Sequence, residues 1–149
     1  MNVLDIKKIF SYIGIDKVRF GMSPDEVASI WGTAEHGSEN FLNELVEFRN
    51  GISTTYSHGK MLVEVGLPKN CTNVELNNIP IFLPSKKDRL RQLLALDRSP
   101  MEDVGMIVFK DLSISITGFE HSDDSDLAMS VFSRGRWDKD FKTMTRYQP

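Results

Sequence analysis

Residues 20–32 constrain the fold more than any other stretch, because they specify where a helix begins and where it ends. Ser23 and Glu26 have the spacing of a capping box, in which each side chain accepts a hydrogen bond from the other residue's backbone N–H. Pro24 occupies the first helical position, where its missing N–H costs nothing. Gly32 can take the left-handed conformation that ends a helix. The sequence therefore predicts a short helix that starts at Ser23 and stops before Gly32.

Apolar spacing predicts two more helices. Over residues 5–13 the apolar side chains recur three and four positions apart, and the same spacing appears over residues 86–96. Strand-like runs are predicted at residues 42–48, 52–57, 61–67, 105–109, 112–119 and 127–132. The polar tail can contain a short helix from Asp138. We expect the core to contain Ile9, Phe10, Val27, Ile30, Trp31, Val46, Phe48, Leu90, Leu93, Leu94, Phe109 and Ile116.

These elements predict an α+β fold, in which an antiparallel sheet of about six strands carries the helices on one face. The order helix, strand, strand, strand occurs twice along the chain. We therefore expect one domain over residues 1–149, with repeat halves at 15–67 and 78–133 and a C-terminal tail at 134–149. The alternative is that two β-meanders agree by chance.

The Asn50-Gly51 turn between two predicted strands allows two registers. A two-residue turn pairs Arg49 with Ile52, whereas a three-residue loop pairs Phe48 with Ile52. We expect the second register, because it places the apolar residues of both strands on one face.

Composition excludes several classes of protein. One cysteine, Cys71, allows no internal disulfide and no thiolate metal cage made by one chain. Neither a secretion signal nor an apolar run long enough to span a membrane is visible, so we expect a cytoplasmic protein. The three histidines fall in predicted loops or turns, and no hydrolase, phosphate-binding or metal motif is recognisable. We expect no catalytic residues, no metal and no cofactor.

Charge is distributed unevenly, although the net charge is only −3. Six acids and no basic residue lie between Phe20 and Phe48, and four carboxylates lie within residues 120–126, which we name the acidic loop. An ordinary solvated surface explains this pattern, and so does an acidic face that meets a basic partner. Nucleic acid could bind instead through Lys86, Lys87, Arg89 and Arg91, but a pI near 5.6 argues against it.

The segment from Phe20 to Val27, with Trp31-Gly32 and a following β-meander, resembles the repeat of β-lactamase-inhibitor-like and outer-membrane assembly lipoprotein-like domains. Such a tandem arrangement in a small acidic chain is similar to immunity proteins of bacterial polymorphic toxins, including contact-dependent growth inhibition systems. The chain departs from the lipoprotein members, because it shows no signal peptide and no lipidation cysteine near its start.

The resemblance implies a non-enzymatic immunity protein that blocks the active site of a cognate toxin domain, such as a basic nuclease, with an acidic surface. The free protein would be a monomer or a weak dimer. An accessory or regulatory protein-binding domain is the alternative, and a small hydrolase is third. The acidic loop can mimic the charge of a nuclease substrate. The expected contact residues are Glu120, His121, Asp123, Asp124, Asp126, Glu35, Glu39, Glu44 and Glu47.

Overall fold

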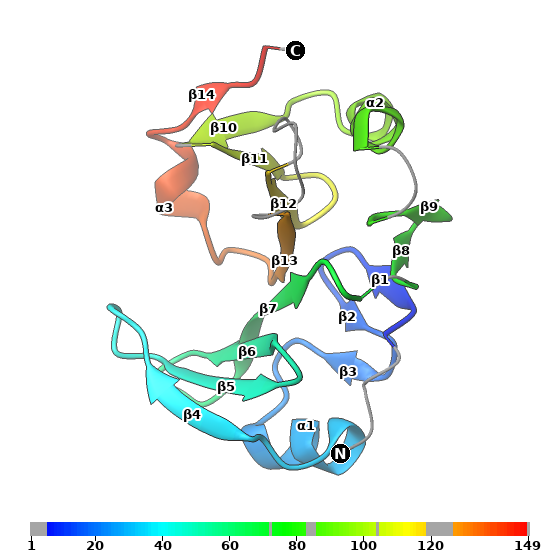
Figure 1. Cartoon of the computed structure of the whole chain (residues 1–149). Coiled ribbons are helices and arrows are strands. Elements are labelled where there is room, and N and C mark those ends of the chain that lie inside the picture. The colour runs from blue at the N-terminus through cyan, green and yellow to red at the C-terminus, as the bar shows by residue number, and fades with distance from the viewer. Residues whose placement is uncertain (1–5, 72, 83–85, 104, 119–126, 149) are drawn as a thin grey trace.

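The computed structural model describes residues 6–71, 73–82, 86–103, 105–118 and 127–148. Within these residues the chain forms two sheets and three short helices (Figure 1). The large sheet has the order β14 (Thr145–Arg146), β10 (Met101–Asp103), β11 (Met106–Phe109), β12 (Ile114–Thr117), β13 (Ala128–Phe132), β7 (Leu62–Pro68), β6 (Ile52–Tyr56), β5 (Leu45–Arg49), β4 (His36–Glu39). The small sheet has the order β3 (Val18–Arg19), β2 (Gly14–Ile15), β1 (Lys8–Phe10), β8 (Glu75–Leu76), β9 (Ile79–Pro80). The helices are α1 (Pro24–Trp31), α2 (Lys86–Leu96) and α3 (Asp138–Phe141).

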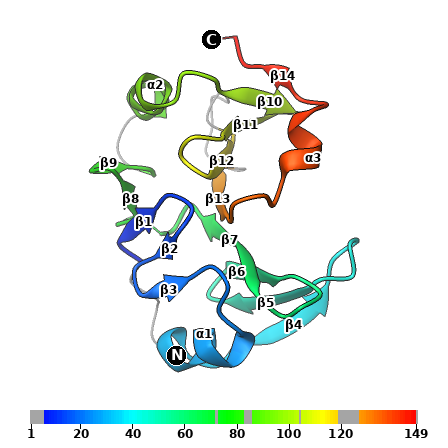
Figure 2. The same cartoon turned by 180° about the vertical axis from the view of Figure 1, so that it is seen from behind.

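The small sheet lies against one face of the large sheet, which we call the inner face, with α1 beyond one of its edges and α2 beyond the other (Figures 1 and 2). The core fills the space between these layers, where Ile15 and Leu76 of the small sheet and Val65, Ile114 and Val131 of the large sheet are 0% exposed. Helix α3 lies on the opposite side, over the outer face.

The expected α+β fold, with one sheet of about six strands and helices on one face, is therefore wrong. The described part of the chain is mostly β, and a second sheet supplies most of the layer over the inner face. Several strands escaped prediction because they are short and polar, so that they show no alternation of apolar and polar residues. His36–Glu39 is one example, with all four residues exposed.

Residues 6–13 form a strand and a turn rather than the expected helix. Strand β1 pairs in parallel with β8 and antiparallel with β2. The Asp16 carboxylate accepts hydrogen bonds from the backbone N–H groups of Lys7 and Lys8, at 3.0 and 2.8 Å. Tyr12 has a φ of 63°, which does not occur within a right-handed α-helix. Strand pairing and the Asp16 contacts outweigh an apolar spacing that is too short to decide between helix and strand.

The two other helices are confirmed. Ser23 Oγ accepts from the Glu26 N–H at 3.2 Å, Glu26 Oε1 accepts from the Ser23 N–H at 3.1 Å, and Gly32 closes α1 with a φ of 91°. Helix α2 has the predicted bounds. The short helix predicted from Asp138 is also present.

The predicted register of the β5–β6 hairpin is wrong. Arg49 pairs with Ile52 across a two-residue turn in which Asn50 and Gly51 both have positive φ. Arg49 points to the inner face, where it is 2% exposed and its Nε donates to the Gly32 carbonyl at 2.7 Å. The expectation failed because this inner position is occupied by an arginine that donates a hydrogen bond to the Gly32 carbonyl, and not by an apolar residue.

Two antiparallel neighbours, β7 and β13, form the centre of the large sheet, and a four-stranded meander ends at each of them. A two-stranded hairpin and a helix precede each meander along the chain. The predicted unit of one helix and three strands is thus wrong by one strand in each half, while the repeat boundaries 15–67 and 78–133 stay a prediction.

The expected core is confirmed in part. Phe10 and Ile30 are surface residues at 39% exposure, because β1 replaces the expected helix and because α1 turns Ile30 outward. Trp31, Phe48, Leu90 and Leu94 are half-buried. The buried members are Ile9, Val27, Val46, Leu93, Phe109 and Ile116.

Candidate binding surface

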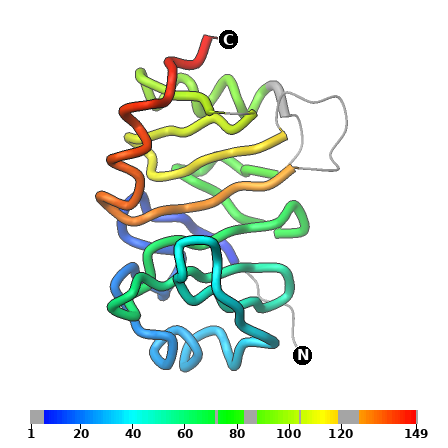
Figure 3. The backbone as a smooth tube through the Cα atoms, turned by 90° about the vertical axis from the view of Figure 1, so that its left-hand side faces the viewer, coloured from blue at the N-terminus to red at the C-terminus, as the bar shows by residue number. Residues whose placement is uncertain are grey.

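The outer face of the large sheet carries small and polar side chains at its centre. Alternation along the central strands sends most of their apolar residues inward, so that neighbouring strands present Ser115, Ser130, Gly66 and Ser53 in one row on the outer face. The segment that contains α3 and the tip of the β4–β5 hairpin both project on this side (Figures 1 and 3). A partner that approaches the outer face therefore meets these two projections.

The hairpin tip, residues 40–44, is held by its own hydrogen bonds. Asn40 Oδ1 accepts from the N–H groups of Leu42 and Glu44, at 2.9 and 3.0 Å. The His58 ring donates from Nε2 to the Leu42 carbonyl at 2.9 Å. Phe41 stands at this tip with 89% of its surface exposed, and Leu42 and Met61 are 40% and 52% exposed. The tip is a pre-formed turn that presents apolar side chains to solvent.

Arg136, in the turn before α3, joins the two projections. Its guanidinium donates to both carboxylate oxygens of Glu44, at 2.5 and 2.8 Å, and its Nε donates to Glu64 Oε1 on β7 at 3.2 Å. The Arg136 and Glu44 side chains are 10% and 9% exposed. The Arg136 cluster, which we define as Arg136, Glu44 and Glu64, therefore fixes the end of the hairpin tip and the α3 segment to β7.

The pKa values of the two carboxylates in this cluster are shifted in opposite directions. The bidentate hydrogen bond from Arg136 holds the pKa of Glu44 below its ordinary value of 4.5, against the effect of burial. Burial raises the pKa of Glu64, and its single contact with Arg136 offsets this only in part. Glu44 is thus the principal anionic partner of Arg136.

Glu44→Gln should make stability less dependent on pH. A folded-state pKa below the unfolded one means that ionised Glu44 stabilises the fold above about pH 4.5 and that this contribution is lost as the pH falls through the folded pKa. Glu64 contributes to the pH dependence of stability with the opposite sign, because its raised pKa means that the folded state is favoured when this carboxyl is protonated. We expect the variant to lose about 2 kcal/mol at about pH 7 and much less at about pH 3.

Urea unfolding across this pH range measures the difference between the variant and the wild type. Glu39→Gln is the matched control, since it removes an exposed carboxylate from the same hairpin and should change stability by less than about 0.5 kcal/mol. If Glu44→Gln lowers the free energy of unfolding by the same amount at every pH, the lowered pKa of Glu44 is contradicted.

The structure does not bring the acidic residues expected between 35 and 47 into one patch. Glu35 accepts from the Asn50 N–H at 2.7 Å, and Glu39 is exposed on β4. Glu44 is buried against Arg136, and Glu47 lies 3.5 Å from Arg49. Only Glu39 presents an exposed side chain with no internal partner among the described residues.

The acidic loop, with Glu120, His121, Asp123, Asp124 and Asp126, lies outside the described residues. Its role in binding stays a prediction. His36, which was expected in a loop, lies on β4 and stacks on Phe48 with ring centroids 4.7 Å apart.

Sequence reasoning missed the exposed apolar tip and the Arg136 cluster. The tip had a visible signal, because Phe41 and Leu42 are two apolar residues between Asn40 and Asn43, whose side chains favour turns. The cluster had none, since Arg136 and Glu44 are separated by 92 positions.

Searches against protein-family models, curated proteins and solved structures found no match. In the described part of the chain, no three His, Cys, Asp or Glu side chains are grouped so that they could hold a metal ion. No helix there combines the length and the apolar character that crossing a membrane requires.

Proposed function

We propose that this chain is a bacterial immunity protein, which acts in the cytoplasm without catalysis by binding a cognate toxin domain. The outer face and the hairpin tip are the proposed docking surface. The observation that carries the proposal is Phe41, an aromatic side chain 89% exposed at the end of a turn that its own hydrogen bonds hold in place.

Phe41 has the properties of a binding anchor. Exposing a large aromatic ring to water is unfavourable, and burying it in a partner regains that free energy. Because the turn is already ordered, binding costs little conformational entropy there. Leu42, its neighbour in the same turn, is 40% exposed and adds to this apolar surface. Aromatic anchors of this kind dominate the binding energy of many protein interfaces.

The partner should be basic. The chain carries a net charge of −3, and Glu39 is an exposed carboxylate on the same hairpin as Phe41. A positive partner would be steered toward such a surface, and salt would slow its association. A basic nuclease domain fits this description.

The test is to co-express the chain with the toxin domains encoded beside its gene and to measure both growth and the dissociation constant of the purified pair. We expect one such domain to arrest growth, and we expect the chain to relieve that arrest. Phe41→Ala should weaken binding about 30-fold, because truncating an aromatic anchor costs about 2 kcal/mol.

Ile13→Ala serves as the matched control, since Ile13 is an apolar residue 54% exposed in the β1–β2 turn. It should bind like the wild type. If no neighbouring domain is neutralised, the immunity function is rejected. If Phe41→Ala neutralises and binds as well as the wild type, the hairpin tip is rejected as the contact.

A further inference from the structure

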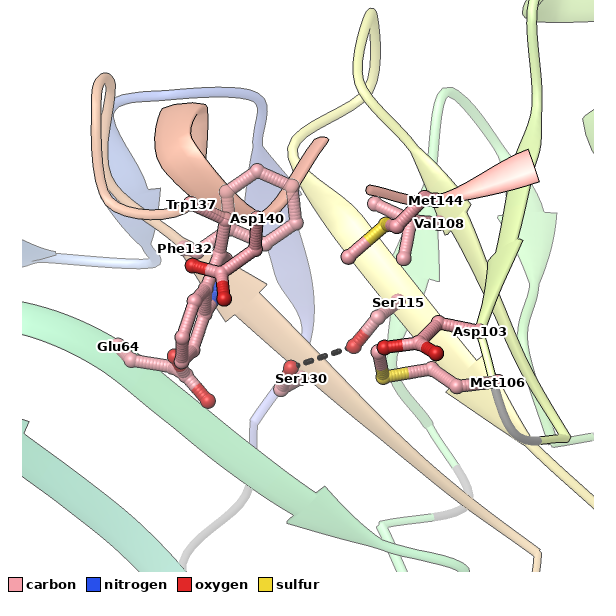
Figure 4. Close-up of a pocket in the computed structure, with 10 residues that line it drawn as sticks. All are labelled: Glu64, Asp103, Met106, Val108, Ser115, Ser130, Phe132, Trp137, Asp140 and Met144. Carbon is pink, nitrogen blue, oxygen red and sulfur yellow. Dashed lines mark hydrogen bonds between the residues drawn. The ribbon is translucent and has the colours of Figure 1, made fainter. Parts of the chain in front are cut away.

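A pocket of about 190 Å³ opens on the outer face beside the α3 segment. Figure 4 shows its lining, in which the Ser115 and Ser130 hydroxyls meet between side chains from several elements. Apolar walls come from the strands and from the C-terminal segment. The ten residues that line it are Glu64, Asp103, Met106, Val108, Ser115, Ser130, Phe132, Trp137, Asp140 and Met144.

The charge in this pocket is of one sign. Glu64, Asp103 and Asp140 approach from β7, β10 and α3, and none of the ten lining side chains is basic. Glu64 contacts Arg136, but no cation within the described residues forms an ion pair with Asp103 or Asp140. Asp103 and Asp140 are exposed, so a cation that enters the pocket meets two carboxylates whose charge no cation in the described part of the chain neutralises.

The pocket floor adds hydrogen-bonding capacity. Ser115 is 7% exposed, and its Oγ lies 2.7 Å from Ser130 Oγ. A pair of hydroxyls uses one O–H donor and one lone pair in the bond between them. The remaining lone pairs can accept from the N–H groups of an ammonium or a guanidinium.

The size and the walls identify the kind of ligand. A volume of about 190 Å³ is below the range of about 300–1,000 Å³ that holds whole small-molecule ligands, so the pocket suits one side chain. The Met106 and Met144 thioethers are adaptable surfaces for an aliphatic stem. Lysine and arginine combine such a stem with a cationic head.

We propose that this pocket receives a lysine or arginine side chain of the bound partner, with its head group between Asp103 and Asp140 and its stem against Met106 and Met144. The source of that side chain, a basic toxin domain, rests on the function proposed above. The chemistry of the pocket does not.

The test uses pentylammonium and butylguanidinium ions as probes, with neutral 1-pentanol as the uncharged analogue, followed by amide chemical shifts of the ¹⁵N-labelled chain. We expect saturable shifts at residues around the pocket with at least one cation, and about tenfold weaker binding of pentanol. Asp103→Asn combined with Asp140→Asn should weaken binding of the cations about tenfold, since both side chains are exposed and the fold should tolerate the change.

Asp25→Asn combined with Asp88→Asn is the matched control, because it removes two exposed carboxylates of α1 and α2 that do not line the pocket. It should leave cation binding unchanged. Pentanol binding as tight as the cations, shifts elsewhere on the surface, or full binding by the Asp103/Asp140 variant would each overturn the proposal. The titration contains no toxin, so the two proposals can fail separately. If the cations do not bind, neutralisation of a toxin through Phe41 is still possible. If no toxin is neutralised, binding of the cations to the pocket still holds.

Discussion

Arg136→Ala should destabilise the protein by about 3 kcal/mol, because it leaves Glu44 and Glu64 without their shared cation. The Glu44 and Glu64 side chains are 9% and 20% exposed, so water can solvate them only in part. Urea or guanidinium unfolding at neutral pH measures this loss. The same substitution should free the hairpin tip from the α3 segment, so backbone amides of residues 40–44 should exchange their hydrogens faster.

Arg134→Ala is the control for this change. Arg134 comes two positions before Arg136 in the sequence, and its side chain is exposed. Its guanidinium carbon lies 4.2 Å from the centre of the Tyr12 ring. Its loss should cost less than about 1 kcal/mol, as expected for an exposed cation–π contact. Adding Glu44→Gln and Glu64→Gln to Arg136→Ala should recover part of the stability, since the carboxylates no longer carry an unpaired charge. Equal losses for Arg134→Ala and Arg136→Ala would contradict the structural role of the Arg136 cluster.

Phe109→Ala should cost about 3–5 kcal/mol. Phe109 lies on the inner side of β11, is 0% exposed and belongs to the core between the two sheets. Removing its ring loses apolar burial and leaves a cavity that the close-packed layers fill only in part. Thermal or denaturant unfolding measures the loss. Phe109→Leu keeps most of the volume and should cost about 1 kcal/mol, so it reports on the same site if the alanine variant does not fold.

Phe41→Ala is the natural counterpart, because it makes the same substitution at a residue 89% exposed. It should change the free energy of unfolding by less than about 0.5 kcal/mol while it weakens partner binding. A large stability loss at Phe41 would show that the tip packs against the protein itself. A loss below about 1 kcal/mol at Phe109 would contradict the packing of the two sheets.

Local chemistry in the sequence was sufficient for α1 and α2. The Ser23 and Glu26 side chains bond to backbone groups three residues away, so the start of α1 depends on no distant contact. Helix α2 follows from the apolar spacing of Leu90, Leu93 and Leu94.

Tertiary pairing decided the elements that sequence patterns misplaced. Residues 6–13 have apolar spacing compatible with a helix, yet the parallel neighbour β8 comes from more than 60 positions away and supplies the hydrogen bonds of a strand. The β5–β6 register places Arg49 on the inner face, where the Gly32 carbonyl, 17 positions away, accepts from its Nε. Neither partner is visible within the short window on which periodicity depends.

The sequence alone determined the capped helix α1, the bounds of α2 and the acidic balance of this protein, because each depends on neighbours along the chain. Only the tertiary structure decided that a second sheet covers the core, that Glu44 is buried beneath Arg136, and that Glu64, Asp103 and Asp140 surround one pocket. These features join residues tens of positions apart, and the free energy that selects them comes from burial and hydrogen bonding between strands. Composition and local spacing carry no record of such contacts.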